Sequence, residues 1–296
     1  MRADIRVPET GAVALETAVL THGLPRPLNL QAALQMEEAV RAAGAIPATI
    51  ALLKGVPTVG LTREELHWLA QQPDVPKIAR HNLTLAIAQG WTGGTTVSAT
   101  LLIAHRAARI PILATGGIGG VHRGERHDVS ADLLTLAQTP MLVVCSGAKA
   151  ILDLPATREM LETLGIPVVG YRTDEMPGFY TPRTGLPVDA VVHSPEEAAT
   201  LWQRHVATGL GNGMLLVQPP PAEFALDAGE LEVMLQQAVS EAEQRHIHGA
   251  QLTPWLLHRL GELSGGRTLQ VNLALLAANA RLAGQIARLL SSGKIE

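Results

Sequence analysis

The chain has 296 residues, of which 47% are hydrophobic and 17% charged, and its formal net charge is −4. This composition is typical of a globular protein with a large core, and the absence of a basic excess argues against a nucleic-acid partner. The single cysteine excludes an intramolecular disulfide, and neither an apolar signal core nor an apolar run of membrane-spanning length is found, so we expect a cytoplasmic protein without a membrane partner.

The first quarter of the sequence predicts two helices and one strand. Asn29 is a predicted helix cap, and its helix runs toward Gly44 with an apolar stripe. Residues 46–53 follow as a strand. Thr62 and Glu65 have the spacing of a capping box, which predicts that a second helix begins there.

The middle of the chain alternates short apolar strands with helices. The predicted strands are residues 83–88, 110–114, 141–145 and 168–171, and the predicted helices are 96–108 (opened by Gly93 and Gly94), 130–137 and a segment from 148 onward. Such alternation favours a mostly parallel sheet that is covered by helices on both faces. The last third is mostly helical, over roughly 228–244, 254–263 and 269–290. The proline run 219–221 is the best candidate boundary but is too short to establish two domains, so we interpret residues 1–296 as one domain.

Lys149 is the most informative residue. Only four of the 23 basic residues are lysine, yet one of them directly follows the apolar run 141–145. An amine that is partly removed from water is more easily neutral, and a neutral amine attacks carbonyl carbons and forms Schiff bases, which arginine cannot do. The alternative is a lysine that extends to solvent or pairs with an acid such as Asp153.

Glycine-rich and polar segments follow the predicted strands, where ligands bind in parallel sheets. The backbone amides of residues 93–96 and 115–120 could bind an anion, although glycine-rich turns are also ordinary connections in this fold class. The second segment is not a dinucleotide fingerprint, because His122 interrupts the glycine spacing, and it lacks the Gly-Lys-Ser/Thr ending of a P-loop. Asp128, Ser130 and Asp132 bring two carboxylates and a hydroxyl to a helix start, where Asp128 or Ser130 could simply be the cap.

Three further polar residues are candidates for a site. Glu16 directly follows an apolar stretch, where burial can raise the pKa of a carboxyl and let it act as a general acid; a solvated or ion-paired carboxylate is the alternative. Lys77 could bind a phosphate or be an exposed loop lysine. Asn272 is polar within an apolar helical segment and is expected to bond something specific, which could be backbone.

Taken together, these segments resemble the pseudouridine-5'-phosphate glycosidase family, which includes indigoidine-synthase-A-like members. The resemblance extends from Ala14 to about Ala287, and its most specific stretches are residues 14–16, 21–23, 93–97, 114–124, 130–133, 149–153 and 170–175. That family reversibly cleaves the carbon–carbon glycosidic bond of pseudouridine 5'-phosphate to give uracil and ribose 5-phosphate. The resemblance implies a three-layer α/β/α sandwich that assembles as a homotrimer.

The resemblance also implies roles for individual residues. Lys149 corresponds to the Schiff-base lysine, Glu16 to the proton donor, and Asp128 to the aspartate that holds a divalent metal ion, Mn²⁺ or alternatively Mg²⁺. The implied substrate-binding positions are Lys77, Val97, Thr115, His122, Ser130, Ala131, Asp132 and Asn272. A carbon–carbon bond has no leaving oxygen or nitrogen to protonate, so the paired carboxylates of ordinary glycosidases do not suffice, whereas an imine at C1' supplies an electron sink.

The chain departs from the family pattern at several positions. His81 and Asn82 stand where Arg-Asp is expected, Ala150 replaces a serine, the spacer over residues 122–128 is shorter, and Ala278-Asn279 replaces a paired asparagine. These departures bear on metal geometry and base recognition. Three other functions stay open at this point: an aldolase-like lyase acting on sugar phosphates, a dinucleotide-dependent oxidoreductase, and a phosphosugar sensor without turnover.

Overall fold

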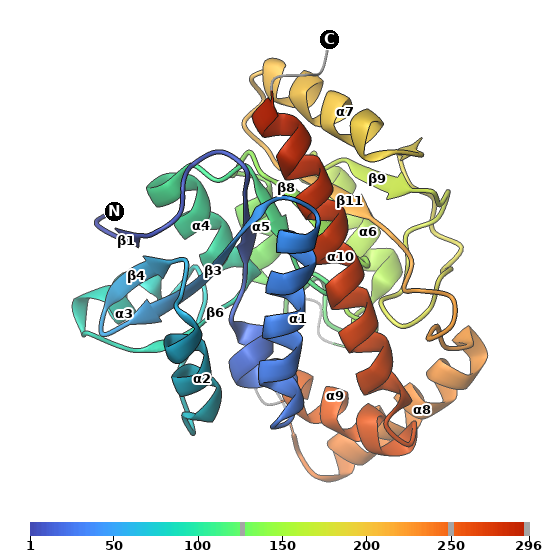
Figure 1. Ribbon diagram of the computed structural model, residues 1–296. Coiled ribbons are helices and arrows are strands. Elements are labelled where there is room, and N and C mark those ends of the chain that lie inside the picture. The colour runs from blue at the N-terminus through green and yellow to red at the C-terminus, as the bar shows by residue number, and fades with distance from the viewer. Residues whose placement is uncertain (125–127, 248–251, 293–296) are drawn as a thin grey trace.

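The computed structural model describes residues 1–124, 128–247 and 252–292, and 11 strands of this part of the chain form one sheet (Figure 1). The strand order is β1 (Asp4–Ile5), β4 (Val56–Val59), β3 (Ile46–Leu53), β2 (Ala12–Leu15), β7 (Ile112–Ala114), β8 (Leu142–Cys145), β11 (Met214–Val217), β9 (Val168–Tyr171) and β10 (Ala190–Val192). Beside this path, β6 (Gly93–Thr95) pairs with β3, and β5 (Lys77–Ile78) pairs with β6.

The strands from β3 through β10 in this order all run parallel, while β4 and β6 are antiparallel to β3. Every residue of β2, β7, β8 and β11 is buried. Such strands must be apolar along their whole length because both faces of the sheet are covered, which is why they stand out as continuous apolar runs. The prediction of a mostly parallel sheet is confirmed, and the carboxyl ends of these strands meet at one edge.

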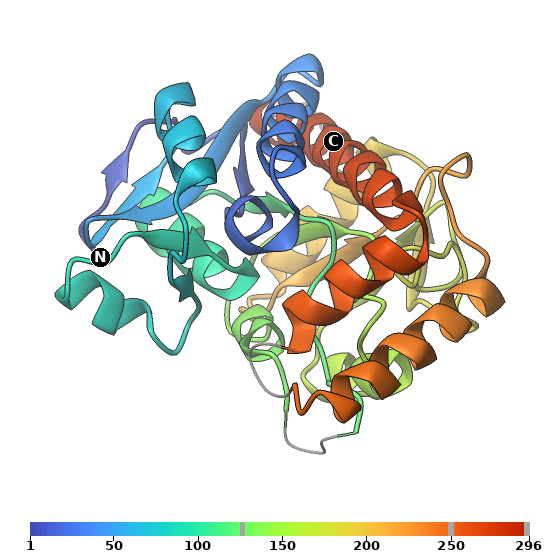
Figure 2. The same ribbon diagram turned by 90° about the horizontal axis from the view of Figure 1, so that it is seen from below.

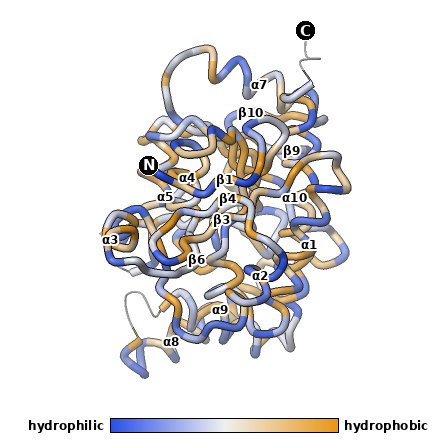
Figure 3. Tube along the Cα trace, turned by 60° about the vertical axis from the view of Figure 1, so that its left-hand side comes forward, coloured by the Kyte–Doolittle hydropathy of each residue, from blue (hydrophilic) through white to orange (hydrophobic). Residues whose placement is uncertain are grey.

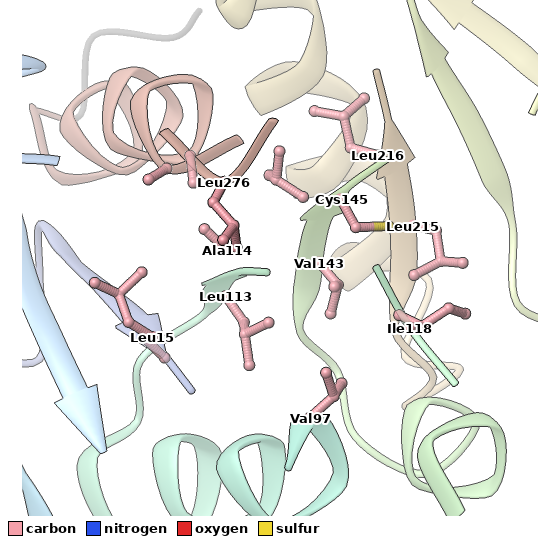
Figure 4. Close-up of a cluster of buried hydrophobic side chains, with 14 of the residues drawn as sticks. Leu15, Val97, Leu113, Ala114, Ile118, Val143, Cys145, Leu215, Leu216 and Leu276 are labelled. Atoms are coloured by element: carbon pink, nitrogen blue, oxygen red, sulfur yellow. The ribbon is translucent and has the colours of Figure 1, made fainter. Parts of the chain in front are cut away.

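Helices cover both faces of the sheet. On one face, α1 (Leu28–Ala42) packs on β3 and α10 (Arg267–Ser292) packs on β2, β7 and β8, and the two helices lie side by side in Figure 1. On the other face, α4 (Val97–Ala108) packs on β2 and β3 and contacts α5 (Ala131–Leu136). Figure 4 shows Leu276 of α10 and Val97 of α4 on opposite sides of the strand residues Leu113 and Val143. The α/β/α sandwich is confirmed.

The remaining helices lie around this sandwich. They are α2 (Arg63–Gln71), α3 (Leu83–Ala88), α6 (Leu154–Thr163), α7 (Pro195–Ala207), α8 (Ala228–Gln244), α9 (Leu252–Leu263) and a short π-helix, η1 (Val19–Gly23). Helices α8 and α9 pack against each other, and α9 also contacts η1 (Figure 2). Hydrophobic and hydrophilic residues are interleaved along the helices, as expected for helices buried on one side (Figure 3).

Helix α10 is long and apolar enough to cross a membrane by length and composition, but half of the relevant window is buried inside the protein. Its neighbours are α1 and the central strands. This is the behaviour of a core helix, so its hydropathy is weak evidence for a membrane segment.

Several predicted elements are confirmed, and two predictions in the first third are wrong. Strand β3 has the predicted bounds, and both hydrogen bonds of the capping box join Thr62 and Glu65. Asn29 is not a cap: it lies inside α1, and its amide donates to the carbonyl oxygens of Leu20 (2.8 Å) and Ala70 (3.1 Å). Residues 83–88 form helix α3 rather than a strand, because burial falls on Leu83 and Ala86, three residues apart, which is a helical spacing.

The glycine pair expected to open one helix and the start of another helix also differ from prediction. Residues 93–95 form strand β6, and α4 begins after Thr96, whose hydroxyl accepts from the Ala99 amide. No helix covers residues 148–153. Helix α6 begins at Leu154 with Asp153 as its cap, at 3.0 Å from the Ala156 amide. The segment that carries Lys149 is therefore a loop between β8 and α6.

Candidate active site

A cleft with two adjoining compartments opens at the carboxyl edge of the parallel strands. The outer compartment has a volume of about 780 Å³, and the inner one about 50 Å³. Glu16, Lys77 and Lys149 line both compartments and therefore mark the place where the two meet. These are the two predicted catalytic residues and the predicted phosphate-binding lysine, so the structure brings together groups that lie far apart in the sequence.

The parallel strands place these groups. Glu16 directly follows β2, Thr115 directly follows β7, and Lys149 lies four residues beyond the end of β8. Strands β2, β7 and β8 are neighbours in the sheet, so their carboxyl ends lie next to one another. This is where an α/β sheet binds ligands.

Glu16 is buried, and the Thr115 hydroxyl donates a hydrogen bond of 2.5 Å to its Oε1 atom. Burial raises the pKa of Glu16 above its ordinary value, because an ion is poorly solvated inside the protein; the charge of Lys149 and the bond from Thr115 act in the opposite direction. A carboxyl with a raised pKa keeps a proton available nearer to neutral pH. This confirms the expectation that Glu16 is a buried acid rather than a solvated one.

Lys149 is partly buried, and backbone hydrogen bonds fix the loop that carries it. Its amide donates to the Ile118 carbonyl at 3.1 Å, and its carbonyl accepts from the Leu152 amide at 3.0 Å. Gly147 turns the chain at φ +82°, and a Cβ atom there would lie 2.1 Å from the Pro177 carbonyl oxygen. Only glycine fits this turn, which directs the chain from β8 to the cleft.

Lys77 is solvent-accessible along the cleft that it lines, but the cleft walls remove enough water to lower the pKa of its ammonium, and the charge of Lys149 lowers it further. In the sheet, Lys77 is in register with Gly94. A Cβ atom on Gly94 would lie 2.2 Å from the Thr21 hydroxyl, and one on Gly93 would lie 2.3 Å from the Pro76 carbonyl oxygen. These glycines let β5 and η1 approach β6 closely.

The amides that follow Gly93 and Gly94 are used inside the protein. Thr95 donates to the Thr17 hydroxyl at 3.0 Å, Thr96 to the Ile78 carbonyl at 2.8 Å, and Ser98 to Asp132 at 2.9 Å. The suggestion that residues 93–96 offer free amides to an anion is therefore not supported. The glycine pair instead serves close packing beside Lys77.

The outer compartment collects most of the predicted substrate-binding positions. Its lining includes Val97, His122, Ser130, Ala131 and Asp132, together with the predicted metal ligand Asp128. The hydroxyl of Ser130 caps α5 by accepting from the Asp132 amide at 3.2 Å, as one of the sequence alternatives had it.

Asp132 accepts hydrogen bonds from two backbone amides, a structural role that the sequence did not indicate. It is buried, with Oδ1 accepting from the Ser98 amide and Oδ2 from the Gly119 amide, both at 2.9 Å. The carboxylate thus joins the first turn of α4 to the glycine-rich loop after β7. A Cβ atom on Gly119 would lie 2.2 Å from the Ser130 hydroxyl, so the loop passes very close to the start of α5.

The predicted metal position has few protein donors. His122 Nδ1 lies 3.1 Å from Asp128 Oδ2, and the side chain of Asp128 is 41% exposed. Within the described ranges, no group of three or more His, Cys, Asp or Glu side chains could hold a metal ion; residues 125–127 lie outside those ranges. One carboxylate beside an imidazole suits a hard cation that keeps most of its water ligands, such as Mg²⁺ or Mn²⁺, better than it suits zinc.

The inner compartment holds the other two predicted substrate-binding residues, Thr115 and Asn272, beside the apolar side chains of Phe179 and Leu276. The loop glycines Gly116 and Gly117 make room for the ring of Phe179, because a Cβ atom on Gly117 would lie 2.6 Å from it. Thr115 and His122 therefore line different compartments, and Lys77 lines both.

Sequence reasoning gave no role to His22 and Thr253, and it marked His81 and Asn82 only as departures from the family pattern. His22 lines the inner compartment, His81 and Asn82 line the outer one, and Thr253 lines both. His22 was part of a conspicuous segment, residues 21–23, but had no assigned role; its Nδ1 lies 2.7 Å from the Thr21 hydroxyl, and burial followed by the charge of Lys77 lowers its pKa. Thr253 carried no local signal, because only the fold brings α9 over the cleft.

Comparison with known proteins gives consistent matches along almost the whole chain. The family model described as indigoidine synthase A like protein matches residues 6–289. A relative from Thermus thermophilus, named pseudouridine-5'-phosphate glycosidase, is 52% identical over 279 residues, covering 94% of this chain and 97% of that protein. A relative of the same name from Herpetosiphon aurantiacus is 50% identical over 277 residues, covering 93% of this chain and 91% of that protein.

Two solved structures are also similar. The crystal structure of an indigoidine synthase A-like protein from Thermotoga maritima aligns with a TM-score of 0.91 at 36% identity, covering 98% of this chain and 97% of that one. The prealnumycin C-glycosynthase AlnA, solved in complex with ribulose 5-phosphate, aligns with a TM-score of 0.87 at 37% identity, covering 95% of this chain and 92% of that one.

Proposed function

Since the chain belongs to the family of indigoidine synthase A-like proteins, we propose that it is a pseudouridine-5'-phosphate glycosidase, which reversibly cleaves the carbon–carbon glycosidic bond of its substrate to uracil and ribose 5-phosphate. The observation that carries this proposal is the meeting of Lys149, Glu16 and Lys77 at the junction of the two compartments. An amine, a buried acid and a cation beside a cleft are the groups that this reaction needs.

The chemistry follows from these groups. The Lys149 nitrogen bonds to C1' of the ribose while the ring oxygen leaves with a proton that Glu16 supplies. The nitrogen became an ammonium when it bonded to C1', so it returns a proton to Glu16, and the lone pair that it regains forms a C1'=N bond as the bond from C1' to uracil breaks. The electron pair of the broken bond stays on the uracil carbon, which takes the proton from Glu16. Water hydrolyses the imine, which releases ribose 5-phosphate and regenerates the amine. The net reaction consumes one water molecule.

The cations of the cleft are proposed to hold the 5'-phosphate. Lys77 lines both compartments and His122 lines the outer one. Thr115 is also one of the implied substrate-binding positions, but its hydroxyl donates to Glu16. The main proposed role of Thr115 is therefore to bond the carboxyl of Glu16. Lys77 and His122 are proposed to bind the phosphate.

Asp128, beside His122, is proposed to hold one Mn²⁺ or Mg²⁺ ion largely through water molecules. Such an ion supplies positive charge that neutralises and orients a phosphate. A homotrimer is likewise part of the proposal, supported by the resemblance described from the sequence, and so is the cytoplasmic location that the sequence led us to expect.

The test is an assay with pseudouridine 5'-phosphate and Mn²⁺ in which released uracil is separated and quantified. We expect stoichiometric uracil and ribose 5-phosphate from the wild-type protein and none from Lys149→Arg. Ribose 5-phosphate binding without any uracil release would favour a phosphosugar sensor. Turnover of other sugar phosphates without action on pseudouridine 5'-phosphate would favour an aldolase-like lyase.

A further inference from the structure

One side chain of α10, Asn279, joins the ends of three neighbouring strands. Its Nδ2 donates to the Thr115 carbonyl oxygen at 2.8 Å, just after β7, and lies 3.2 Å from the Ser146 hydroxyl, just after β8. Its Oδ1 accepts from Gln218 Nε2 at 2.7 Å, just after β11. Asn279 is fully buried and lines neither compartment of the cleft, so it contacts the site only through these partners.

Thr115 connects this network to the proposed proton donor. Its carbonyl is held by Asn279, while its hydroxyl donates to Glu16 Oε1. Its amide donates to the Val144 carbonyl at 3.0 Å as the ladder between β7 and β8 continues. The position of the hydroxyl therefore depends on where Asn279 holds the backbone of the same residue.

We propose that Asn279 is a positioning residue for the reaction: through Thr115, it fixes the carboxyl of Glu16 in the geometry from which the proton is transferred. This inference rests on the proposed function. An asparagine is required because the position needs a donor and an acceptor at once, which an aspartate or a leucine of similar volume does not offer. In a dry site, either unpaired partner would move to find another bond.

The network also affects the protonation of Glu16. Burial raises the pKa of Glu16, and the Thr115 hydrogen bond lowers it. The charged groups that act on this carboxyl are Lys149 beyond β8, Lys77 on β5 and Asp132 on α5, and His22 on η1 lines the same compartment. Asn279 changes none of these charges, so a change there alters the pKa of Glu16 only by moving Thr115, and the expected direction is upward.

The test compares Asn279→Ala, Thr115→Val and the double variant in the uracil-release assay across pH. We expect Asn279→Ala to lower kcat about tenfold, as expected when one hydrogen bond to the acid is lost, with KM within a few-fold of wild type. The limb of the pH profile that reports Glu16 should move to higher pH. In the Thr115→Val background, the Asn279 substitution should add little, because both changes break the same connection.

A matched control is Gln218→Met, which removes the third partner of Asn279 but leaves its bond to Thr115, and should keep the wild-type kcat and pH limb. If Asn279→Ala does not fold, Asn279→Leu keeps the volume, loses the same donor and adds no charge, and the same displacement of the limb is expected. The proposal is overturned if the folded variant loses thermal stability but keeps the wild-type kcat and pH limb. It is equally overturned if the two effects simply add.

The inference can be tested separately from the proposed function. Infrared titration of the protein without substrate, with Glu16→Gln as the reference, reports the protonation of the Glu16 carboxyl directly. We expect a higher apparent pKa in Asn279→Ala than in wild type. An absence of uracil release by the wild type would refute the function alone, whereas an unchanged infrared titration would refute the role of Asn279.

Discussion

Replacing Asp132 by asparagine tests whether this residue holds the cleft together. In the wild-type protein, its two oxygens accept from the amides of Ser98 and Gly119, each at 2.9 Å, and the side chain is buried. Asparagine has the same shape but only one acceptor oxygen. Its NH₂ group must therefore face one of the two amide donors, and that donor is left without a partner.

The size of the effect follows from these contacts. A hydrogen bond to a charged group contributes about 1.5–3 kcal/mol, so losing one should reduce the free energy of unfolding of Asp132→Asn by about the same amount. At about 2–4 °C for each kcal/mol in a protein of this size class, the melting temperature should fall by about 3–12 °C.

Thermal and urea unfolding of the ligand-free protein measure this change. Asp128→Asn is a matched control on the same cleft wall, because that carboxylate is 41% exposed and should change the free energy of unfolding by less than about 1 kcal/mol. Equal melting temperatures for wild type and Asp132→Asn would show that the two amides do not depend on the carboxylate. Asp132 would then be a substrate contact only.

Three further predictions concern the reaction. Lys77→Ala should weaken the apparent affinity for 5'-phosphate substrates about 10- to 100-fold, the worth of one charge-assisted bond, and comparable wild-type activity on unphosphorylated pseudouridine would contradict this. Exhaustive chelation should lower activity reversibly, with Mn²⁺ restoring it, and full activity of the chelated protein would rule out a required metal. In Glu16→Gln, the side chain still accepts a hydrogen bond from Thr115 but cannot transfer a proton. We therefore expect kcat to fall about 10²–10⁴-fold with little loss of stability. A lower melting temperature with full activity would show that Glu16 has a structural role instead. The pH dependence of stability tests the same residue. Because the pKa of Glu16 is raised in the folded protein, the stability that its protonated carboxyl contributes is fully present below the pKa of an unfolded glutamate and is lost as pH rises through the folded-state pKa. Unfolding measured across pH should therefore show a smaller loss of stability for Glu16→Gln than for wild type over that range.

Much of the fold could be predicted because its central strands are buried on both faces. Continuous apolar runs with glycine-rich turns locate β7, β8 and β9 to within a residue or two, and the capping box locates α2. Short segments were less predictable. Residues 83–88 have strand-like composition, and only the burial of Leu83 and Ala86 in the folded protein shows a helical period.

The site could be predicted in part for the same reason. Glu16 and Lys149 follow apolar strands, and parallel strands bring their ends together. What the sequence could not show is which polar atoms satisfy one another. The hydrogen bonds of Asp132 and those of Asn279 join residues that are far apart in the chain. The position of Thr253 beside the cleft depends on the packing of α9.

The most direct test of the account is to trap the imine. The protein is incubated with ribose 5-phosphate and borohydride, digested, and analysed by mass spectrometry, with Lys149→Arg as the control. We predict a reduced pentose-phosphate adduct on the peptide that contains Lys149 and none in the variant, since a guanidinium cannot form the imine. An adduct on Lys77, or uracil release by the variant at the wild-type rate, would contradict the assignment of Lys149 as the nucleophile.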